Sequence, residues 1–135
     1  CTISIDNPNS GTYLYNINVS LFEMLLMNLL TNALKYNESD RPTINILFRS
    51  LEKEMHIRFE DNGIGIDQKE IRKIFKKFYQ VGSPNNRTAK GSGIGLYMAE
   101  HIAKVHKGKL KAESRGKGFG TSFSLILPHR PASGI

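Results

Sequence analysis

The segment NLLTNALKY, residues 28–36, decides how the rest of the chain can be arranged, because it combines helical spacing with two chemically different faces. At about 100° per residue, two carboxamides, an ammonium and a phenol fall within an arc of roughly 100°. These polar side chains are Asn28, Asn32, Lys35 and Tyr36, and the adjoining arc is apolar: Phe22, Leu26, Leu29, Leu30 and Ala33. The apolar face predicts packing in a core, whereas the polar face is either a solvated surface or a binding site.

Glycine-rich segments further along the chain favour the binding site. They are Asp61-Asn62-Gly63-Ile64-Gly65, Gly91-Ser92-Gly93-Ile94-Gly95-Leu96 and Gly118-Phe119-Gly120-Thr121, with Ile74-Phe75-Lys76-Lys77-Phe78 between the first two. Together with residues 28–36, their order and spacing resemble the catalytic and ATP-binding domain of bacterial two-component sensor histidine kinases, a GHKL (Bergerat-fold) domain. One glycine motif alone is weak evidence, but ordered motifs in compatible contexts are specific. The resemblance extends from about Asn18 to Pro128.

The length and composition predict one domain with its own core. A chain of 135 residues can bury such a core without a metal or a disulfide, and the single cysteine, Cys1, cannot form an internal bridge. No apolar run approaches the ~18 residues needed to cross a bilayer, and the first residues lack the features of a signal peptide. We expect a cytoplasmic domain at residues 1–130 and a tail or linker at 131–135, with any membrane attachment in other parts of a parent protein.

The charge balance favours anionic partners. Lys and Arg number 19 against 12 Asp and Glu, a net charge of +7, which does not distinguish a nucleotide from a nucleic acid or an acidic protein. No nucleic-acid partner is expected, because the sequence has neither a recognisable nucleic-acid-binding module nor aromatic residues interleaved with its cations.

The first half of the chain predicts strands around one helix. Alternating residues at 2–5 and 12–17 predict a hairpin. A helix is expected over residues 20–36, with Ser20 and Glu23 spaced as a capping box. Residues 44–48 and 55–59 also alternate, which predicts an antiparallel pair with one buried face and with Asp61 at the end of its second strand.

The second half predicts two more helices and a closing hairpin. Asp67 and Glu70 have the spacing of another capping box, which predicts a short helix as far as Phe75. Residues 79–92 read as a mobile loop, and residues 93–106 as a helix. The expected buried side of that helix is Leu96, Ala99, Ile102, Ala103 and Val105.

Gly108 is expected to end that helix, and residues 109–114 and 121–127 to pair as a hairpin. The elements together predict an α/β two-layer sandwich. Its mixed, mainly antiparallel sheet of about five strands would pack on three helices.

The resemblance implies that the chain binds ATP and Mg²⁺ and that Asn28, Asn32 and Lys35 are catalytic. Asn32 would be the first metal ligand, with Asn28 one helical turn earlier, since magnesium takes oxygen ligands and usually keeps several waters. Lys35 would meet phosphate oxygens as a point charge, and Tyr36 would lie against the nucleotide. For Tyr36, a simple core or rim position remains the alternative.

The adenine would lie at the other glycine segments. By the resemblance, Asp61 accepts a hydrogen bond from the adenine amine, and Gly63 and Gly65 let the backbone approach the base. Ile66 and Thr121 are counted with the ATP-binding residues on the same ground. From this segment alone, without the other motifs, a strand-ending aspartate bonded to its own backbone is the preferred interpretation of Asp61.

The phosphates would lie at the start of the second predicted long helix. Gly91, Gly93 and Gly95 leave backbone amides and the positive helix end open to an anion. Arg87 and Lys90 could close over the triphosphate, or could simply keep the loop soluble.

Three more residues of that region are counted with the ATP-binding residues by the resemblance: Ser92, Ile94 and Leu96. Phe78 is counted with them as well. For Phe75 and Phe78, however, anchoring the loop to the core is favoured over contact with nucleotide.

Asn28 separates this chain from other ATPases of the fold. In type II topoisomerases and mismatch-repair proteins, a glutamate that activates water stands at its place, whereas Glu23 here points to another side of the helix. Hydrolysis therefore lacks its base, and ATP should persist until a better nucleophile arrives. Serine kinases of the anti-sigma type usually carry glutamate there too, which makes them less favoured relatives.

The acceptor is expected to lie outside the chain. The histidines are His56, His101, His106 and His129, and none has the His-Glu or His-Asp helical context of a phosphoacceptor. The resemblance implies transfer of the γ-phosphoryl group to a histidine on dimerisation helices of a parent kinase, with a response-regulator receiver domain downstream. A degenerate nucleotide-sensing or partner-binding module and a protein serine kinase remain the alternatives.

Overall fold

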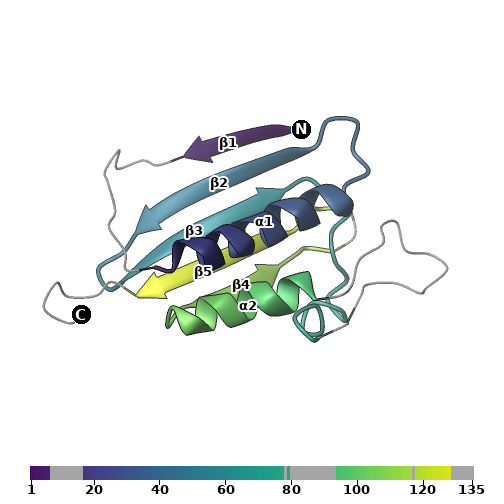
Figure 1. The fold of residues 1–135 in the computed structure, drawn as a ribbon. Helices are drawn as coiled ribbons and strands as arrows, with labels where there is room; N and C mark the ends of the chain where they lie inside the picture. Colours follow the sequence, from purple (N-terminus) through teal and green to yellow (C-terminus); the bar gives the residue numbers. More distant parts are fainter. Residues whose placement is uncertain (7–16, 78, 80–93, 117, 129–135) are drawn as a thin grey trace, which may run out of the picture.

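A computed structural model describes residues 1–6, 17–77, 79, 94–116 and 118–128. In this part of the chain, two helices cover one face of a five-stranded sheet whose strand order is β1-β2-β3-β5-β4 (Figure 1). The strands are β1 Thr2–Asp6, β2 Thr43–Ser50, β3 Glu54–Asp61, β4 Lys109–Glu113 and β5 Ser122–Pro128; the helices are α1 Val19–Lys35 and α2 Gly95–Val105. The predicted two-layer α/β sandwich with a mixed, mainly antiparallel sheet is confirmed.

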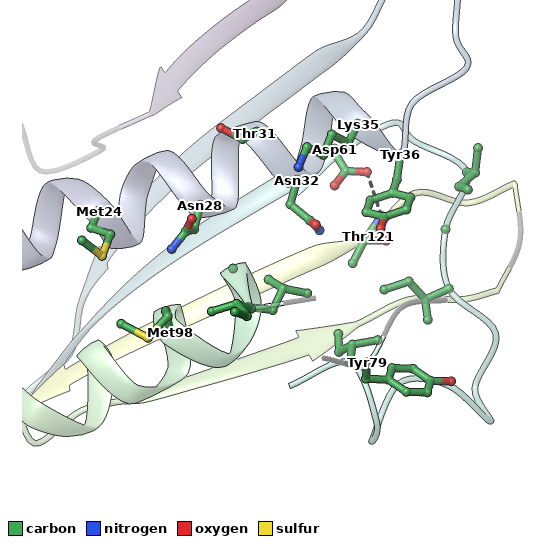
Figure 2. Close-up of a pocket in the computed structure, with 17 residues that line it drawn as sticks. Met24, Asn28, Thr31, Asn32, Lys35, Tyr36, Asp61, Tyr79, Met98 and Thr121 are labelled. Atoms are coloured by element: carbon green, nitrogen blue, oxygen red, sulfur yellow. Dashed lines mark hydrogen bonds between the residues drawn. The ribbon is translucent and has the colours of Figure 1, made fainter. Parts of the chain in front are cut away.

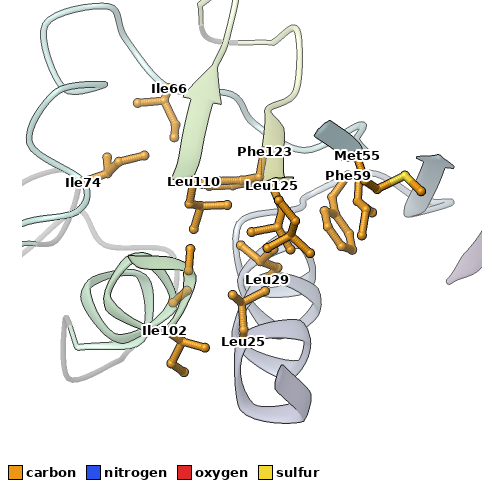
Figure 3. Close-up of a cluster of buried hydrophobic side chains, with 14 residues drawn as sticks. Leu25, Leu29, Met55, Phe59, Ile66, Ile74, Ile102, Leu110, Phe123 and Leu125 are labelled. Atoms are coloured by element: carbon orange, nitrogen blue, oxygen red, sulfur yellow. The ribbon is translucent and has the colours of Figure 1, made fainter. Parts of the chain in front are cut away.

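The core lies between the sheet and the two helices (Figure 3). Burial alternates along β3 and β5, as expected of strands with one covered face. Helix α1 contributes Leu25 and Leu29 to this core, and α2 contributes Ala99 and Ile102. The buried stripe of α1 leaves its asparagines on the side that faces α2.

The described partner of β1 is β2, which the sequence did not predict, and the hairpin of residues 2–5 with 12–17 stays a prediction. β1 pairs with β2 in parallel, with Thr2 opposite Thr43 and Ile5 opposite Ile46. Parallel neighbours need a crossover connection, and α1 lies in the chain between these two strands. Of the strand expected at 12–17, residues 12–16 lie outside the described residues.

The start of α1 also differs from the prediction. The N-cap is Asn18, which has extended backbone angles and whose side-chain oxygen accepts a hydrogen bond from the N–H of Leu21. The expected capping box of Ser20 and Glu23 is therefore not used, because the helix begins before it at Val19. Asparagine at this position satisfies one of the free N–H groups of the first turn.

Residues 67–77 form consecutive turns in place of the short helix that was expected. The backbone hydrogen bonds of these turns join residues three apart. The N–H of Glu70 donates to the carbonyl of Asp67, that of Lys73 to Glu70, and that of Lys76 to Lys73. The capping-box spacing of Asp67 and Glu70 thus does not start a helix, and Ile71, Ile74 and Phe75 of these turns pack in or against the core. The described residues therefore contain two helices and not three.

Helix α2 ends differently from the prediction. Val105 is 53% exposed, contrary to its expected place on the buried side, and His106 is buried instead. The left-handed residue after the helix is Lys107, with a φ of 61°, while Gly108 serves a close approach: a Cβ there would lie 2.4 Å from the carbonyl oxygen of Ile126. Neither described helix is long and apolar enough to cross a membrane.

Candidate functional site

A cavity of about 320 Å³ lies between α1, the start of α2 and the segment that follows β3 (Figure 2). This volume is within the ~300–1,000 Å³ typical of small-molecule sites. Its lining combines residues that are far apart in the sequence: Met24, Asn28, Thr31, Asn32, Lys35, Tyr36, Asp61, Ile64, Gly65, Ile66, Ile74, Tyr79, Ile94, Gly95, Leu96, Met98 and Thr121.

The polar face of α1 forms one wall of this cavity. Asn28 and Asn32 are half-buried and one helical turn apart, and Lys35 is exposed near the end of the helix. A Cβ added to Gly95 would lie 3.5 Å from the Oδ1 atom of Asn28. The carboxamide of Asn28 and the first residue of α2 therefore border the same space.

The start of α2 has the features of an anion site. Its first turn contains no acidic residue. The amides and the positive dipole end of such a helix favour phosphate or carboxylate groups. Since Ile94, Gly95 and Leu96 line the cavity, this helix end faces the carboxamides of α1.

Asp61 is the charged residue at the other end of the cavity. Its Oδ1 atom accepts hydrogen bonds from the backbone N–H groups of Gly63 at 2.9 Å and Thr121 at 3.1 Å. Both bonds use one oxygen, so among the described residues Oδ2 is the atom that can accept from a ligand. Burial raises the pKa of the Asp61 carboxyl from its ordinary 3.8, and the two backbone hydrogen bonds act against that rise.

The turn after Asp61 is held against the end of α1. The N–H of Ile64 donates to the carbonyl of Tyr36 at 2.9 Å, and a Cβ on Gly63 would lie 2.5 Å from that same carbonyl oxygen. Asn62 fixes the loop after α1, accepting from the side chain of Asn37 at 2.8 Å and from the N–H of Thr43 at 2.9 Å. Glycine at position 63 thus permits the contact that brings Tyr36 and Asp61 to one cavity.

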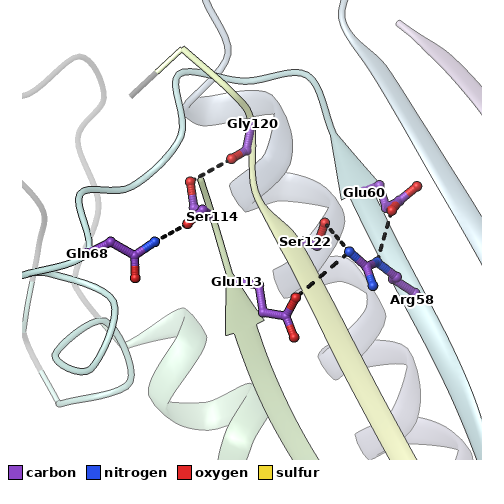
Figure 4. Close-up of polar contacts among 7 residues, drawn as sticks. All are labelled: Arg58, Glu60, Gln68, Glu113, Ser114, Gly120 and Ser122. Atoms are coloured by element: carbon purple, nitrogen blue, oxygen red, sulfur yellow. Dashed lines mark hydrogen bonds and ion pairs between the residues drawn. The ribbon is translucent and has the colours of Figure 1, made fainter. Parts of the chain in front are cut away.

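Ser114 holds the opposite side of the same turn (Figure 4). Its hydroxyl accepts from the N–H of Ile66 at 3.0 Å and donates to the carbonyl of Gly120 at 2.8 Å, while Gln68 donates to its backbone carbonyl. Gly65 has a φ of 78°, and a Cβ there would lie 2.2 Å from the carbonyl oxygen of Gly116. These contacts place Ile66 and Thr121 beside Asp61.

Most of the predicted site residues that the structure describes come together in this cavity. Gly63 does not line it and lies behind Asp61 instead. Six predicted residues lie outside the described part of the chain: Phe78, Arg87, Lys90, Gly91, Ser92 and Gly93. Phe75, which was expected to anchor the neighbouring loop, packs edge-on against Phe123, with the ring centroids 6.3 Å apart.

Six lining residues were not predicted: Met24, Thr31, Ile64, Ile74, Tyr79 and Met98. Helical spacing could have found Met24 and Thr31, which lie four residues before and three after Asn28. Met98 follows Gly95 by three residues and could have been found in the same way.

Asn28 and Asn32 offer carboxamide oxygens to a metal in this cavity. The described residues contain no group of three or more His, Cys, Asp or Glu side chains that could hold a metal ion. Asn28 and Asn32 therefore suit a hard cation that completes its shell with phosphate oxygens and water, as Mg²⁺ usually does.

Comparisons with known proteins agree with this arrangement. Residues 18–131 match the family described as histidine kinase-, DNA gyrase B-, and HSP90-like ATPase. The sensor protein kinases WalK of Staphylococcus saprophyticus and Staphylococcus aureus are each 39% identical over 102 residues, which is 75% of this chain but 17% and 24% of those proteins. The chain thus spans less than a quarter of the length of these relatives.

Solved structures share the fold. The mycobacterial sensor histidine kinase MprB superposes with a TM-score of 0.77 at 20% identity, over 96% of this chain and 81% of that one. The nucleotide-free catalytic domain of the histidine kinase ThkA gives 0.74 at 23% identity, over 96% and 80%.

Proposed function

Because the chain belongs to the histidine kinase-, DNA gyrase B- and HSP90-like ATPase family, we propose that it binds Mg-ATP and donates the γ-phosphoryl group to a histidine on a dimerisation domain outside this sequence. A response-regulator receiver domain would then take the phosphoryl group from that histidine. The observation that supports this most directly is the composition of one cavity: a half-buried carboxylate at one end, and two carboxamides facing a helix start at the other.

Adenine fits the Asp61 end. The Oδ2 atom of Asp61 can accept a hydrogen bond from an N–H group, and the exocyclic amine of adenine supplies one. Guanine presents a carbonyl at the corresponding position. Ile64, Ile66 and Ile74 supply an apolar lining for a flat base. The carboxylate would therefore select adenine by leaving guanine's carbonyl without a donor.

The phosphates fit the end near α2. Backbone amides at the start of α2 and the ammonium of Lys35 would hold phosphate oxygens, and Asn28 and Asn32 would hold the magnesium ion. When bound, that ion neutralises charge on the phosphates. The residues of this chain then position the γ-phosphoryl group.

Transfer, and not hydrolysis, is favoured by the position of the carboxylates. Among the described lining residues the sole carboxylate is Asp61, at the adenine end, and Glu23 is exposed outside the cavity. Water at the phosphate end therefore has no adjacent base. An imidazole nitrogen needs none, since it attacks with its own lone pair.

The test is reconstitution with radiolabelled ATP. The chain would be mixed with the separately produced, histidine-bearing helical domain of its parent kinase, and acid-labile, base-stable phosphate on that domain is expected. ATP binding without any acid-labile product would contradict the proposal. Acid-stable phosphoserine on a partner would instead support the serine kinase alternative.

A further inference from the structure

We propose that Met24 and Met98 form a contact surface for the acceptor, and that an apolar face of the helix carrying the phosphoacceptor histidine packs on these two side chains. This inference rests on the proposed function, because it assigns a second substrate subsite to the same cavity. It concerns two residues to which the ATP site as described gives no role.

The two methionines lie at the end of the cavity away from the adenine position. In Figure 2, Met24 on α1 and Met98 on α2 lie at one end of the cavity, and Asp61, Tyr36 and Thr121 lie at the opposite end. Asn28 lies on α1 between these two groups. Met24 precedes Asn28 by four residues, which is about 6 Å along a helix axis. The methionines therefore lie beyond the carboxamides that border the phosphate position.

Nucleotide does not account for this end of the cavity. A thioether sulfur donates no hydrogen bond, so neither side chain can hold a phosphate oxygen. The described lining contains two charged residues, Lys35 and Asp61, and neither lies beside the methionines. The chemistry of this end is apolar and uncharged, which suits the hydrophobic side of an amphipathic helix.

The position is also open to a macromolecule. The side chain of Met24 is 46% exposed although it lines the cavity. None of the described histidines, His56, His101 and His106, lines the cavity, so among the described residues the acceptor imidazole has no source within it. An acceptor that comes from outside must enter past a wall of the cavity.

In-line phosphoryl transfer requires the acceptor to enter the cavity at the wall that lies beyond the phosphates. The attacking and leaving oxygen or nitrogen atoms lie roughly in line through phosphorus, so the acceptor approaches from the side opposite the rest of the nucleotide. In the step, the lone pair of a neutral imidazole nitrogen forms the N–P bond. The bond from the γ-phosphorus to the bridging oxygen breaks, its electron pair stays on ADP, and the imidazole N–H proton passes to water. With adenine at Asp61, that opposite side is the methionine end.

The experiment compares Met24→Gln, Met98→Gln and the double variant with Met27→Gln. Glutamine has nearly the size of methionine and adds no charge near the phosphates. Met27 is the matched control, because it is an exposed methionine of the same helix, 60% accessible, that does not line the cavity. Each protein would be titrated with a non-hydrolysable ATP analogue and then assayed for phosphoryl transfer over a range of acceptor-domain concentrations.

We expect the double variant to raise the KM for the acceptor domain at least tenfold, with kcat and analogue affinity within twofold of wild type. Met27→Gln should leave all three values within twofold. Equal effects of Met24→Gln and Met27→Gln would overturn the inference, as would a loss of analogue binding in the Met24 or Met98 variants. If the wild-type chain binds the analogue but transfers nothing to the acceptor domain, the proposed function itself fails, and this inference with it.

Discussion

The imidazole of His106 accepts a hydrogen bond from the backbone N–H of Asn18, with Nε2 and N 3.0 Å apart. Its Nδ1 lies 2.8 Å from the carbonyl oxygen of Ile102, so the ring carries its proton on Nδ1 and donates there. Asn18 is the N-cap of α1, and His106 ends α2. One buried, neutral side chain therefore ties together the two helices that form the cavity.

Replacing His106 by alanine should lower the free energy of unfolding by about 2 kcal/mol, because both hydrogen bonds and the edge-on contact with Phe22 are lost. Urea unfolding followed by circular dichroism measures this change. His101→Ala is the control, since His101 is exposed on the same helix and should change stability by less than about 0.5 kcal/mol. Equal effects of the two substitutions would refute the structural role of His106.

Replacing Lys107 by glycine should stabilise the folded protein. Lys107 occupies the left-handed position of a Schellman motif. The N–H of Gly108 donates to the carbonyl of Ala103 at 2.8 Å, and the N–H of Lys107 donates to the carbonyl of Lys104 at 2.9 Å. A residue with a Cβ pays a steric cost there, so Lys107→Gly should raise the free energy of unfolding by about 0.5–1 kcal/mol. Lys104→Gly, inside α2, should instead lower the free energy of unfolding by about 1 kcal/mol. Thermal unfolding of both variants measures these changes, and changes of the same sign would contradict the prediction.

Much of the fold was predictable because the signals were local. Alternation in β2, β3 and β5 indicated strands with one buried face, and the 3.6-residue spacing in α1 gave the helix to within one residue at each end. The polar arc of α1 indicated a site for the same reason, since helical geometry alone places Asn28 and Asn32 on one side.

What the sequence did not reveal depends on partners distant in the chain. β1 has a strand-like pattern whichever strand it joins, and its parallel pairing with β2 is fixed by the crossover through α1. His106 is buried, and its Nε2 atom accepts from Asn18, a residue 88 positions away in the chain. Asn18 in turn begins the helix two residues before the serine of the expected capping box, a competition between caps that local spacing cannot decide.

Substituting Asn32 by alanine should remove most of the gain in ATP affinity that magnesium provides. The carboxamide oxygen would be lost as a metal ligand, so binding with Mg²⁺ should weaken by about tenfold while binding without it changes little. Titration with an ATP analogue, with and without Mg²⁺, measures both values. Thr31→Ala serves as a control at the neighbouring lining position. Equal weakening under both conditions would argue against Asn32 as a ligand.

The Asp61→Asn variant should bind ATP more weakly and yet be more stable than the wild type at neutral pH. The amide oxygen can still accept from Gly63 and Thr121, but it no longer buries a charge at neutral pH. Because the folded pKa of Asp61 is raised above 3.8, the stability that this group contributes is fully present below pH 3.8 and is lost as the pH rises through the folded pKa. The wild-type protein should therefore lose stability relative to the variant as the pH rises above 3.8. Paired urea unfolding curves at several pH values test this, and a relative gain by the wild type with rising pH would be inconsistent with it.

The central claim, that this cavity is an adenine-specific ATP site, is tested most directly by calorimetric titration of the chain with a non-hydrolysable ATP analogue and Mg²⁺. The matching GTP analogue and the Asp61→Asn variant complete the experiment. We predict saturable binding of the ATP analogue, at least about tenfold weaker binding of the GTP analogue, and a similar loss in the folded variant. Absence of binding to the folded wild-type protein, or equal affinity for the two analogues, would contradict the account.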